Sequence, residues 1–353
     1  MFRSHYPARS GAMFMTTAKV QKDSVRRLST LAVVFGALVL SSVSVAVESA
    51  DPLPSWTDGD TKTAIKHFVR DVTNESGADF VPPAQRIAVF DNDGTLWSET
   101  PWVQGLFLVQ QLRNAVARHP SLAEEMSYKA AMENDRQFFA EGGIAVILAA
   151  IKSIVVELTR EEFDAEVREF FATARHPVLN VPYSHIIYQP AIELLEFLKA
   201  NGFRTFICSG GGADFMRVIA SDFYGIEPDQ VIGTSYKKEL LIVDGKWELM
   251  STQDLNPINN KDQKAINIDL HIGQRPLLVM GNAGGQGDIG MLRYSQGREG
   301  RSLQLVIDHN DDVREFAYAE DDNASLNAAK ENDWIVISMK DDWAQIYPQG
   351  TQK

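Results

Sequence analysis

The most regular feature of this sequence is an alternation between short apolar runs and longer stretches with helical spacing. The short runs are bounded by polar or turn residues and predict buried strands at 87–90, 203–208, 231–232, 276–280, 303–307 and 334–337. Apolar residues recur on one helical face in the longer segments 62–72, 191–200, 213–224 and 261–268. Strands that alternate with helices predict an α/β fold with a doubly wound, mostly parallel sheet.

One long stretch interrupts this alternation. From Pro101 to about Ala174, stripes at helical spacing dominate and strand signals are absent; one such stripe is formed by Ile144, Leu148, Ile151 and Ile154. The stretch follows the first strand and ends before the sheet resumes, which predicts an inserted, all-helical cap domain. Further along, apolar residues flank Asp244-Gly245, a pair that favours a hairpin with a two-residue turn.

The amino-terminal residues have the pattern of an export signal. Basic residues precede an apolar run at 31–40, and Ser44-Val45-Ala46 offers a cleavage site of small residues. We predict a signal peptide over residues 1–46 and a periplasmic or secreted protein; the alternative is an uncleaved anchor. Because the basic region is long, Met13 and Met15 are also candidate translation starts. No later run is apolar enough to cross a bilayer, so we expect no stable membrane insertion after cleavage.

Charge and cysteine content narrow the choice of partners. The formal net charge of the chain is -13, which argues against nucleic acid as a partner. Cys208 is the single cysteine, so an internal disulfide is excluded. It lies in a predicted strand, where a small hydrophobic role is expected rather than a nucleophilic one.

The strongest chemical signal follows the first predicted strand. Asp91 and Asp93 stand beyond its carboxyl end, which is where ligands bind in open α/β sheets. Two carboxylates this close are costly unless a cation or a shared proton compensates them, so the pair suggests a divalent metal. The alternative is a solvated Asp-Asn-Asp-Gly turn.

Three further groups follow in chain order. Ser209 precedes three glycines between a strand and a helix, where a tight turn with free backbone N–H groups would bind an anion. Lys264 near a helix start could neutralise phosphoryl charge, and Lys261 is its rival. The polar loop from Gly281-Asn282 to Asp288 follows the strand at 276–280.

Together these motifs resemble the haloacid dehalogenase-like (HAD) hydrolases, most closely the phosphoserine phosphatase-like branch with a helical cap. The resemblance extends from about Arg86 to Pro348 and includes the landmarks 90–97, Glu99, Pro101, 174–177, 188–190, 209–212 and 271–276. It implies a Rossmann-like core at 82–97 and 184–348, a cap at 98–183, and a linker and helix at 47–81.

The resemblance also implies a role for each motif residue. Asp91 would be the nucleophile and Asp93 the general acid and base, with Ser209 and Lys264 completing the catalytic set. Mg²⁺ would be bound by Asp91, Asp93, Asn282 and Asp288. Substrate binding would fall to Thr95, Glu99, Ser209, Gly210, Gly211 and Arg175; His176 could also reach the site from the cap exit, or both it and Arg175 could simply pack there.

One departure from the family pattern concerns the last motif. The loop is about two residues longer than is usual, and Gln286 falls where relatives often carry an acid. We predict that Asp288, directly or through water, supplies the acidic contribution instead.

The resulting hypothesis is an exported, Mg²⁺-dependent phosphatase that hydrolyses a small phosphomonoester through an aspartyl-phosphate. Two alternatives remain open: a phosphotransferase of the same fold, and a catalytically weak phospholigand-binding protein.

Overall fold

A computed structural model describes residues 50–135, 137–139, 141, 146, 149, 152, 158–351 and 353. The chain divides into Met1–Ser49 and a compact unit, Ala50–Lys353, and only the second contains described residues. The predicted signal peptide and the predicted stripe from Ile144 to Ile154 lie outside the described residues. In the part of the chain that is described, no helix combines the length and apolar character that a membrane span requires.

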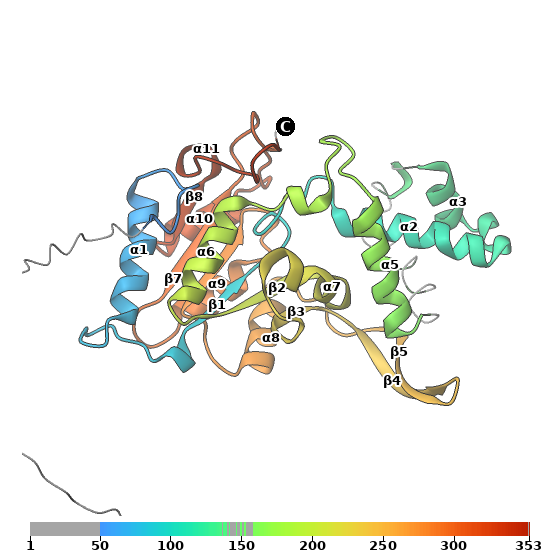
Figure 1. Ribbon diagram of the computed structural model, residues 1–353, viewed down its shortest axis with the longest axis horizontal. Coiled ribbons are helices and arrows are strands. Elements are labelled where there is room, and N and C mark those ends of the chain that lie inside the picture. Colours follow the sequence, from blue (N-terminus) through green and yellow to red (C-terminus); the bar gives the residue numbers. More distant parts are fainter. Residues whose placement is uncertain are drawn as a thin grey trace, which may run out of the picture. The chain divides into compact units, whose positions relative to one another are not determined.

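A six-stranded parallel sheet forms the centre of the unit (Figure 1). In spatial order its strands are β3 (Val231–Thr234), β2 (Arg204–Gly212), β1 (Ile87–Phe90), β6 (Leu278–Asn282), β7 (Leu303–Asp308) and β8 (Ile335–Ser338). Successive strands along the chain are added on one side of β1 (β2, then β3) and afterwards on the other side (β6, β7 and β8). The topological switch point therefore lies between β1 and β6. Ligands of doubly wound sheets bind beyond the carboxyl ends of strands at such a point.

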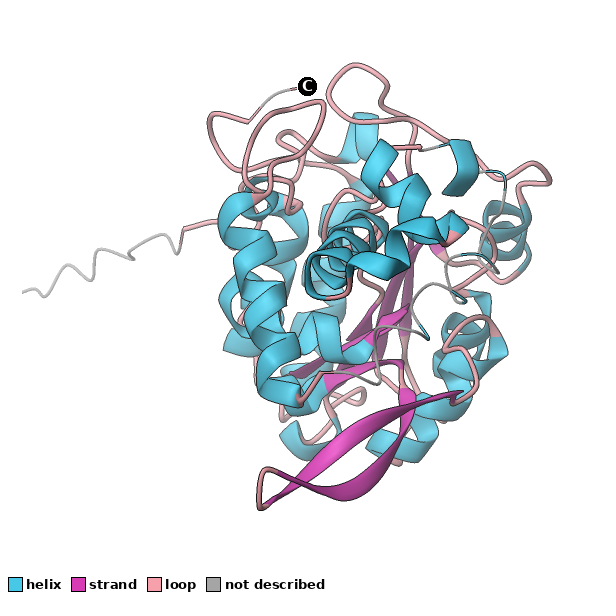
Figure 2. Ribbon diagram, turned by 90° about the vertical axis from the view of Figure 1, so that its right-hand side faces the viewer, coloured by secondary structure: helices cyan, strands magenta, loops and turns pink. Residues whose placement is uncertain are grey.

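Helices cover both faces of this sheet, as Figure 2 shows. Ala88 and Phe90 of β1 pack into one apolar cluster, which includes residues of α1 (Asp60–Thr73), α6 (Gln189–Ala200) and α7 (Ala213–Tyr224). Ile87 and Val89 pack into the other, with α8 (Asp262–Ile272), α9 (Ile289–Gln296) and α10 (Ala324–Glu331). A strand buried on both faces explains the uninterrupted apolar run at 87–90. A short helix, α11 (Met339–Asp342), follows β8. The predicted doubly wound α/β fold is confirmed.

The regular elements described between β1 and α6 are all helices, and loops connect them. It contains α2 (Val103–Arg118), α3 (Met126–Glu133) and α5 (Arg160–Thr173), and α5 begins with a capping box formed by Thr159 and Glu162. Aromatic contacts join α5 to the core, since the rings of Phe171 and Phe223 of α7 lie 5.3 Å apart. The division into core, cap and linker at residues 47–81, 82–97, 98–183 and 184–348 stays a prediction.

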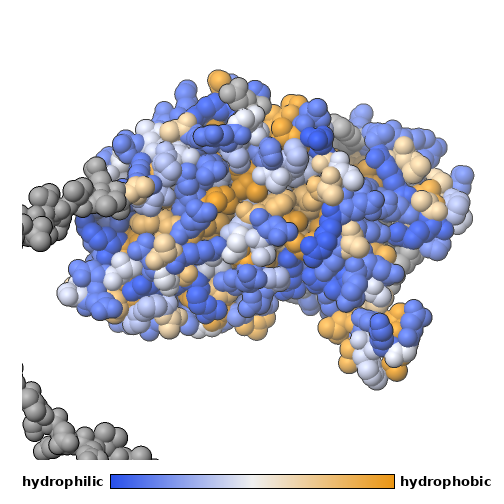
Figure 3. All heavy atoms as spheres, in the orientation of Figure 1, coloured by the Kyte–Doolittle hydropathy of each residue, from blue (hydrophilic) through white to orange (hydrophobic). Residues whose placement is uncertain are grey.

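The predicted hairpin is present and longer than expected. It consists of β4 (Tyr236–Val243) and β5 (Lys246–Leu255), joined by Asp244 and Gly245, both at positive φ. Several apolar residues of the hairpin are exposed: Leu240, Leu241, Ile242, Trp247 and Leu249. Hydrophobic surface is visible on the projection at the lower right of Figure 3. Strand β5 of the hairpin contacts α5, so a hairpin of the core and a helix of the cap pack against each other.

The tight turn predicted at Ser209–Gly212 is wrong. β2 continues through Gly212, and its pairing with β3 shifts so that Cys208 pairs with Ile232 while Gly212 pairs with Thr234. Two extra residues on β2 therefore bulge out of the ladder. A Cβ on Gly211 would lie 2.0 Å from Nε2 of Gln104, so glycine lets the end of the Gln104 side chain approach the backbone closely here. The strand predicted at 276–280 also starts two residues later, which places Asn282 at its last position.

Asp214 ties the cap, the core and the hairpin together. Its carboxylate lies 2.8 Å from Arg160 of α5, 2.8 Å from Lys238 of β4 and 3.3 Å from Arg217 of its own helix. Burial alone would raise the pKa of Asp214, but the hydrogen bond from Lys238 and the three positive charges hold it below its ordinary value.

We expect Asp214→Asn to lower the free energy of unfolding by roughly 1–3 kcal/mol at neutral pH, because three cations lose their shared carboxylate. The pKa is lower in the folded state, so the stabilisation is full above the unfolded-state value of about 3.8 and is lost as the pH falls below it. Denaturant unfolding from pH 7 to pH 3 measures both effects. Asp222→Asn, at an exposed site on the same helix, is the control, and an equal loss in both variants would contradict the role of Asp214.

Candidate active site

The loop after β1 is shaped by its own backbone. The carbonyl of Asn92 accepts hydrogen bonds from the N–H groups of Thr95 and Leu96, at 3.1 and 2.8 Å. Gly94 adopts a φ of +72°, and a Cβ there would lie 2.1 Å from Nδ2 of Asn282. This tight loop carries Asp91 and Asp93 to the switch point between β1 and β6, beside the end of the neighbouring strand.

Asp91 is buried and forms an ion pair with Lys264. The Lys264 Nζ lies 2.6 Å from Oδ1 of Asp91 and 2.5 Å from Oδ1 of Asp288. The other oxygen of Asp288 accepts the backbone N–H of Asn282 at 2.9 Å. One buried ammonium group therefore bridges two carboxylates, one from the first motif and one from the last.

The charge balance of this cluster shifts the ionisation of its members. Burial disfavours the charged form of Lys264, but the carboxylates of Asp288 and Asp91 outweigh it and raise the lysine pKa. Burial and the charge of Asp288 raise the pKa of Asp91 in spite of Lys264. The described groups thus leave excess negative charge at the site, which a further cation would balance.

Asp93 is held by two neighbours. The indole N–H of Trp97 donates to Oδ1 at 2.9 Å, and the Ser209 hydroxyl donates to Oδ2 at 3.4 Å. Burial raises the pKa of Asp93, and the hydrogen bond from Trp97 opposes this effect. A carboxyl group with a raised pKa is suited to donating a proton.

Two of the backbone N–H groups that were predicted to be free for an anion after Ser209 are already hydrogen-bonded within the protein. The Ser209 side chain is buried and accepts the N–H of Gly211 at 3.0 Å. The N–H of Gly212 donates to Oε1 of Gln104, a residue of α2, at 2.8 Å. Of the groups predicted to bind an anion, Ser209 lies beside Asp93. The N–H groups of Gly211 and Gly212 are bonded to Ser209 and Gln104 instead.

The remaining predicted residues differ in their placement. Thr95 is fully buried and its hydroxyl has no hydrogen-bond partner among the described residues. Glu99 is partly buried near the amide of Asn282, at 3.3 Å. Lys261 directly precedes α8 and its side chain is exposed, so the structure brings Lys264 rather than its rival to Asp91.

Arg175 and His176 lie at the cap exit. Arg175 is exposed and donates to the carbonyl of Asn180 at 3.3 Å, while the His176 ring bonds the carbonyl of Thr100 at 2.9 Å. No contact of either side chain with Asp91 or Asp93 occurs among the described residues. A substrate-binding role for Arg175 stays a prediction.

In the loop from Gly281 to Asp288, the side chains of Asp288 and Gln286 make different contacts. Asp288 bonds Lys264 and the Asn282 backbone, so anchoring the lysine is its observed contact. Gln286 turns outward, and its side-chain amide donates to Asp322 at 2.9 Å. A contribution of Asp288 to a metal site stays a prediction.

Two residues near the site were missed by sequence reasoning. Tyr318 accepts the amide of Asn282 at 2.8 Å, and His309 contacts the carbonyl of Gly94 at 2.8 Å. Their rings stack with centroids 4.3 Å apart. Both come from the segment after β7, and no local motif marks them, so only the fold could have brought them to the first loop.

Comparison with known proteins identifies the family of this chain. The sequence model of the haloacid dehalogenase-like hydrolases matches residues 88–276. The chain belongs to this family. The match begins in β1 and includes the Asp91 loop, the Ser209 segment and Lys264. No curated protein matches the sequence.

The solved structures that resemble this chain have low sequence identity to it. A protein of unknown function from Anaerococcus prevotii is 16% identical, with a TM-score of 0.51 over 79% of this chain and 91% of that one. A protein of unknown function from Bordetella pertussis is 16% identical, with a TM-score of 0.45 over 72% and 99%. A phosphoserine phosphohydrolase-like protein from Francisella tularensis is 19% identical, with a TM-score of 0.34 over 63% and 87%. The first of these supports the fold of this HAD-like chain.

Proposed function

We propose that this HAD-like hydrolase is an exported, Mg²⁺-dependent phosphatase that hydrolyses a small phosphomonoester. The observation that carries the proposal is the pairing of buried Asp91 with Lys264 at 2.6 Å, while Ser209 and Trp97 hold Asp93 on the same loop. This arrangement offers a nucleophile, a fixed cation and a second acid. A family member that only displaces a halide does not need the second acid.

The reaction divides into two balanced transfers. Asp91 attacks phosphorus, the bond from phosphorus to the ester oxygen breaks, and Asp93 donates its proton to the departing alcohol. Asp93 then takes a proton from water as the water attacks the aspartyl-phosphate, which releases phosphate and regenerates the carboxylate of Asp91. Lys264 and Ser209 hold the phosphoryl oxygens and the nucleophile in place.

The residues at the site fit a Mg²⁺ ion. Among the described residues no group of three or more His, Cys, Asp or Glu side chains is arranged to hold a metal, so a site needs other oxygen donors. The bond from Lys264 uses Oδ1 of Asp91, and the amide nitrogen of Asn282 faces Glu99 and Tyr318. Oδ2 of Asp91, the carbonyl of Asp93 and Oδ1 of Asn282 would hold the ion, with water completing its preferred six oxygens. When bound, Mg²⁺ supplies positive charge that polarises the phosphoryl group.

We expect Asn282→Ala to raise the Mg²⁺ concentration for half-maximal activity at least about tenfold, because one of the few oxygen ligands is lost. Gln286→Ala should change this concentration little, because its side chain bonds Asp322 instead. Metal titration of phosphate release compares the two variants, and Asp288→Asn tests the acidic contribution predicted for that residue. A larger effect of Gln286→Ala would show that the loop is aligned incorrectly.

Phosphate release from a panel of phosphomonoesters tests the proposal. Turnover should require Mg²⁺ and stop when the metal is chelated. Transfer of the phosphoryl group to an added alcohol in preference to water would indicate a phosphotransferase. Binding of phosphate esters without any turnover would indicate a phospholigand-binding protein.

Export forms the second part of the proposal. It rests on the basic, apolar and small-residue order of the first 46 residues. Mass spectrometry of the protein from its native host should find a mature chain that begins just after Ala46. An intact cytoplasmic chain that begins at Met1, Met13 or Met15 would contradict export, and an intact membrane-bound chain would indicate the anchor.

A further inference from the structure

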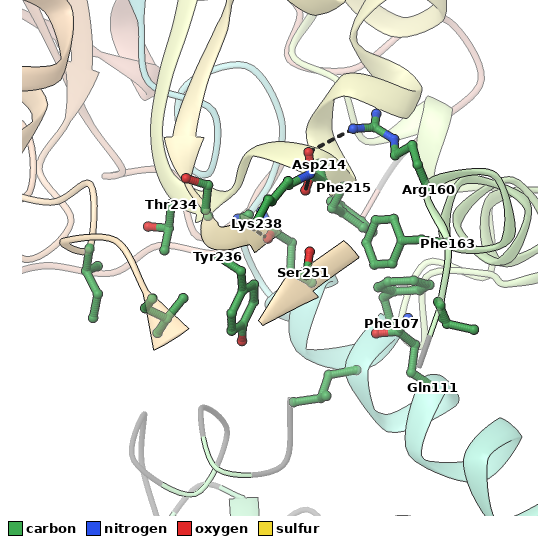
Figure 4. Close-up of a pocket in the computed structure, with 18 of the residues that line it drawn as sticks. Phe107, Gln111, Arg160, Phe163, Asp214, Phe215, Thr234, Tyr236, Lys238 and Ser251 are labelled. Carbon is green, nitrogen blue, oxygen red and sulfur yellow. Dashed lines mark hydrogen bonds and ion pairs between the residues drawn. The ribbon is translucent and has the colours of Figure 1, made fainter. Parts of the chain in front are cut away.

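A pocket adjoins the carboxyl end of β2, where Ser209 lies. It has a volume of about 170 Å³ and reaches the chain at Gly210, Gly211 and Gly212. Its walls come from the cap helices α2 and α5, from α7, and from the hairpin strands β4 and β5 (Figure 4). The pocket thus starts at the residue that follows Ser209 and extends between the cap and the hairpin.

The position of Asp93 assigns this pocket to the leaving group. Asp93 donates a proton to the departing oxygen in the proposed reaction, so that oxygen lies on its side of the phosphorus atom. The Asp93 carboxylate contacts Ser209 at 3.4 Å, and the next residue, Gly210, lines the pocket. A group attached to the departing oxygen can therefore extend past Ser209 into this space.

The walls of the pocket are mainly apolar. Phe107 contacts Phe163 with ring centroids 5.8 Å apart and Phe215 with centroids 5.1 Å apart, and all three line the pocket. In Figure 4 the rings of Phe107 and Phe163 lie together on one side, with Tyr236 on the opposite side. Leu249 and Leu255 of the hairpin add aliphatic surface. Such walls stabilise an apolar group by removing its surface from water.

The charged residues of the pocket are already paired with one another. Asp214 accepts from both Arg160 and Lys238 at 2.8 Å, so its carboxylate is not free to receive a substrate amine. The volume of the pocket is close to the roughly 150 Å³ at which an apolar cavity takes up benzene. Size and polarity thus both match a single ring.

We infer that this pocket binds the leaving group and that the preferred substrate is a phosphomonoester whose alcohol carries an apolar group about the size of one aromatic ring. This inference rests on the proposed phosphatase function.

A second hollow near the site predicts a different substrate preference. It is lined by Glu99, Tyr318, Gly284–Gln286 and 319–322 and is rich in carboxylates. If the leaving group extended to that side, an amine on the alcohol would be favoured instead of a ring. The two hollows therefore predict opposite preferences.

Three esters with the same two-carbon linker separate these preferences: ethyl phosphate, 2-aminoethyl phosphate and 2-phenylethyl phosphate. We expect kcat/KM for the phenyl ester to exceed that for the ethyl ester by at least about tenfold, because burial of far smaller groups already gives that factor. A phenyl ester no better than the ethyl ester, or an amino ester that is the best of the three, would overturn the inference. Hydrolysis of none of the three would count against the proposed function instead.

Binding gives a readout that does not require turnover. The phosphonate counterparts of the ethyl and phenylethyl esters cannot be hydrolysed, and calorimetry should show at least about tenfold tighter binding of the phenyl compound. Equal affinities would overturn the inference even if the chain proved catalytically inactive.

Matched variants place the effect in the pocket. Phe163 and Phe171 both lie on α5 and are partly buried, but only Phe163 lines the pocket. Phe163→Ala should lower the ratio of kcat/KM for the phenyl ester to that for the ethyl ester about fivefold or more, and Phe171→Ala should keep it. The ratio does not depend on how much of the variant is folded, so partial loss of folded protein does not obscure the result.

A second pair of variants, on the hairpin, provides the same test if the variants in α5 do not fold. Leu249 and Leu241 are both exposed, and only Leu249 lines the pocket. Leu249→Ser should lower the same ratio and Leu241→Ser should keep it. Equal ratios in both members of a pair would contradict the assignment of this pocket.

Discussion

Replacing Asp91 by asparagine should reduce turnover by at least about 10³-fold, because an amide oxygen is a poor nucleophile and the aspartyl-phosphate cannot form. The fold should be retained. The side chain keeps its volume, and removal of one charge relieves its repulsion with Asp288 and Asp93. Phosphate release and thermal unfolding of the same preparation measure the two effects.

Asp308→Asn is a matched control for this variant. Asp308 also ends a strand of the central sheet at the same edge, and burial raises its pKa, but its side chain has no described contact with Asp91, Asp93 or Lys264. Its replacement should leave activity within a few-fold of wild type. Activity of Asp91→Asn within the same range would rule out Asp91 as the nucleophile.

Replacing Lys264 by methionine should abolish turnover and also destabilise the protein by roughly 3–5 kcal/mol. Lys264 is the described cation between Asp91 and Asp288, and it is only 2% exposed. Its loss would leave two buried carboxylates close together without their counter-ion. Denaturant unfolding measures the stability and phosphate release measures the activity.

A double variant separates the two roles of the lysine. In Lys264→Met/Asp288→Asn one of the uncompensated charges is removed, so part of the lost stability should return, whereas activity should not. Lys261→Met is the control, since that lysine is exposed just before the same helix and should change stability by less than about 0.5 kcal/mol. Equal stability losses in the single and double variants would contradict a charge bridge between Asp91 and Asp288.

The strands and helices of the core could be predicted because each is marked by a pattern of apolar residues within its own segment. The run at 87–90 is apolar at every position, and the structure buries all four residues between helices on both faces of the sheet. Asp91 and Asp288 directly adjoin a predicted strand or helix, and Ser209 and Lys264 lie within β2 and α8. Parallel pairing of β1 with β2 and β6 then brings these residues together at one edge, as the alternating pattern predicted.

The parts that local sequence did not predict depend on long-range packing. The glycines after Ser209 are typical of a turn, but Gln104 of the cap occupies the space beside Gly211 and the segment stays in the strand. The roles of His309 and Tyr318 depend on their approach to Gly94 and Asn282, far away in sequence. The pocket requires a cap helix and a core hairpin to meet, and no spacing within either segment encodes that contact.

The central claim is that phosphate passes through a covalent bond to Asp91. Rapid acid quench of the enzyme during turnover, followed by borohydride reduction and peptide mass spectrometry, tests it directly, since reduction of an aspartyl-phosphate converts that aspartate to homoserine. We predict homoserine at position 91 in the presence of a phosphomonoester substrate and none in its absence. Steady hydrolysis without modification at position 91, or with modification at another aspartate, would contradict this account.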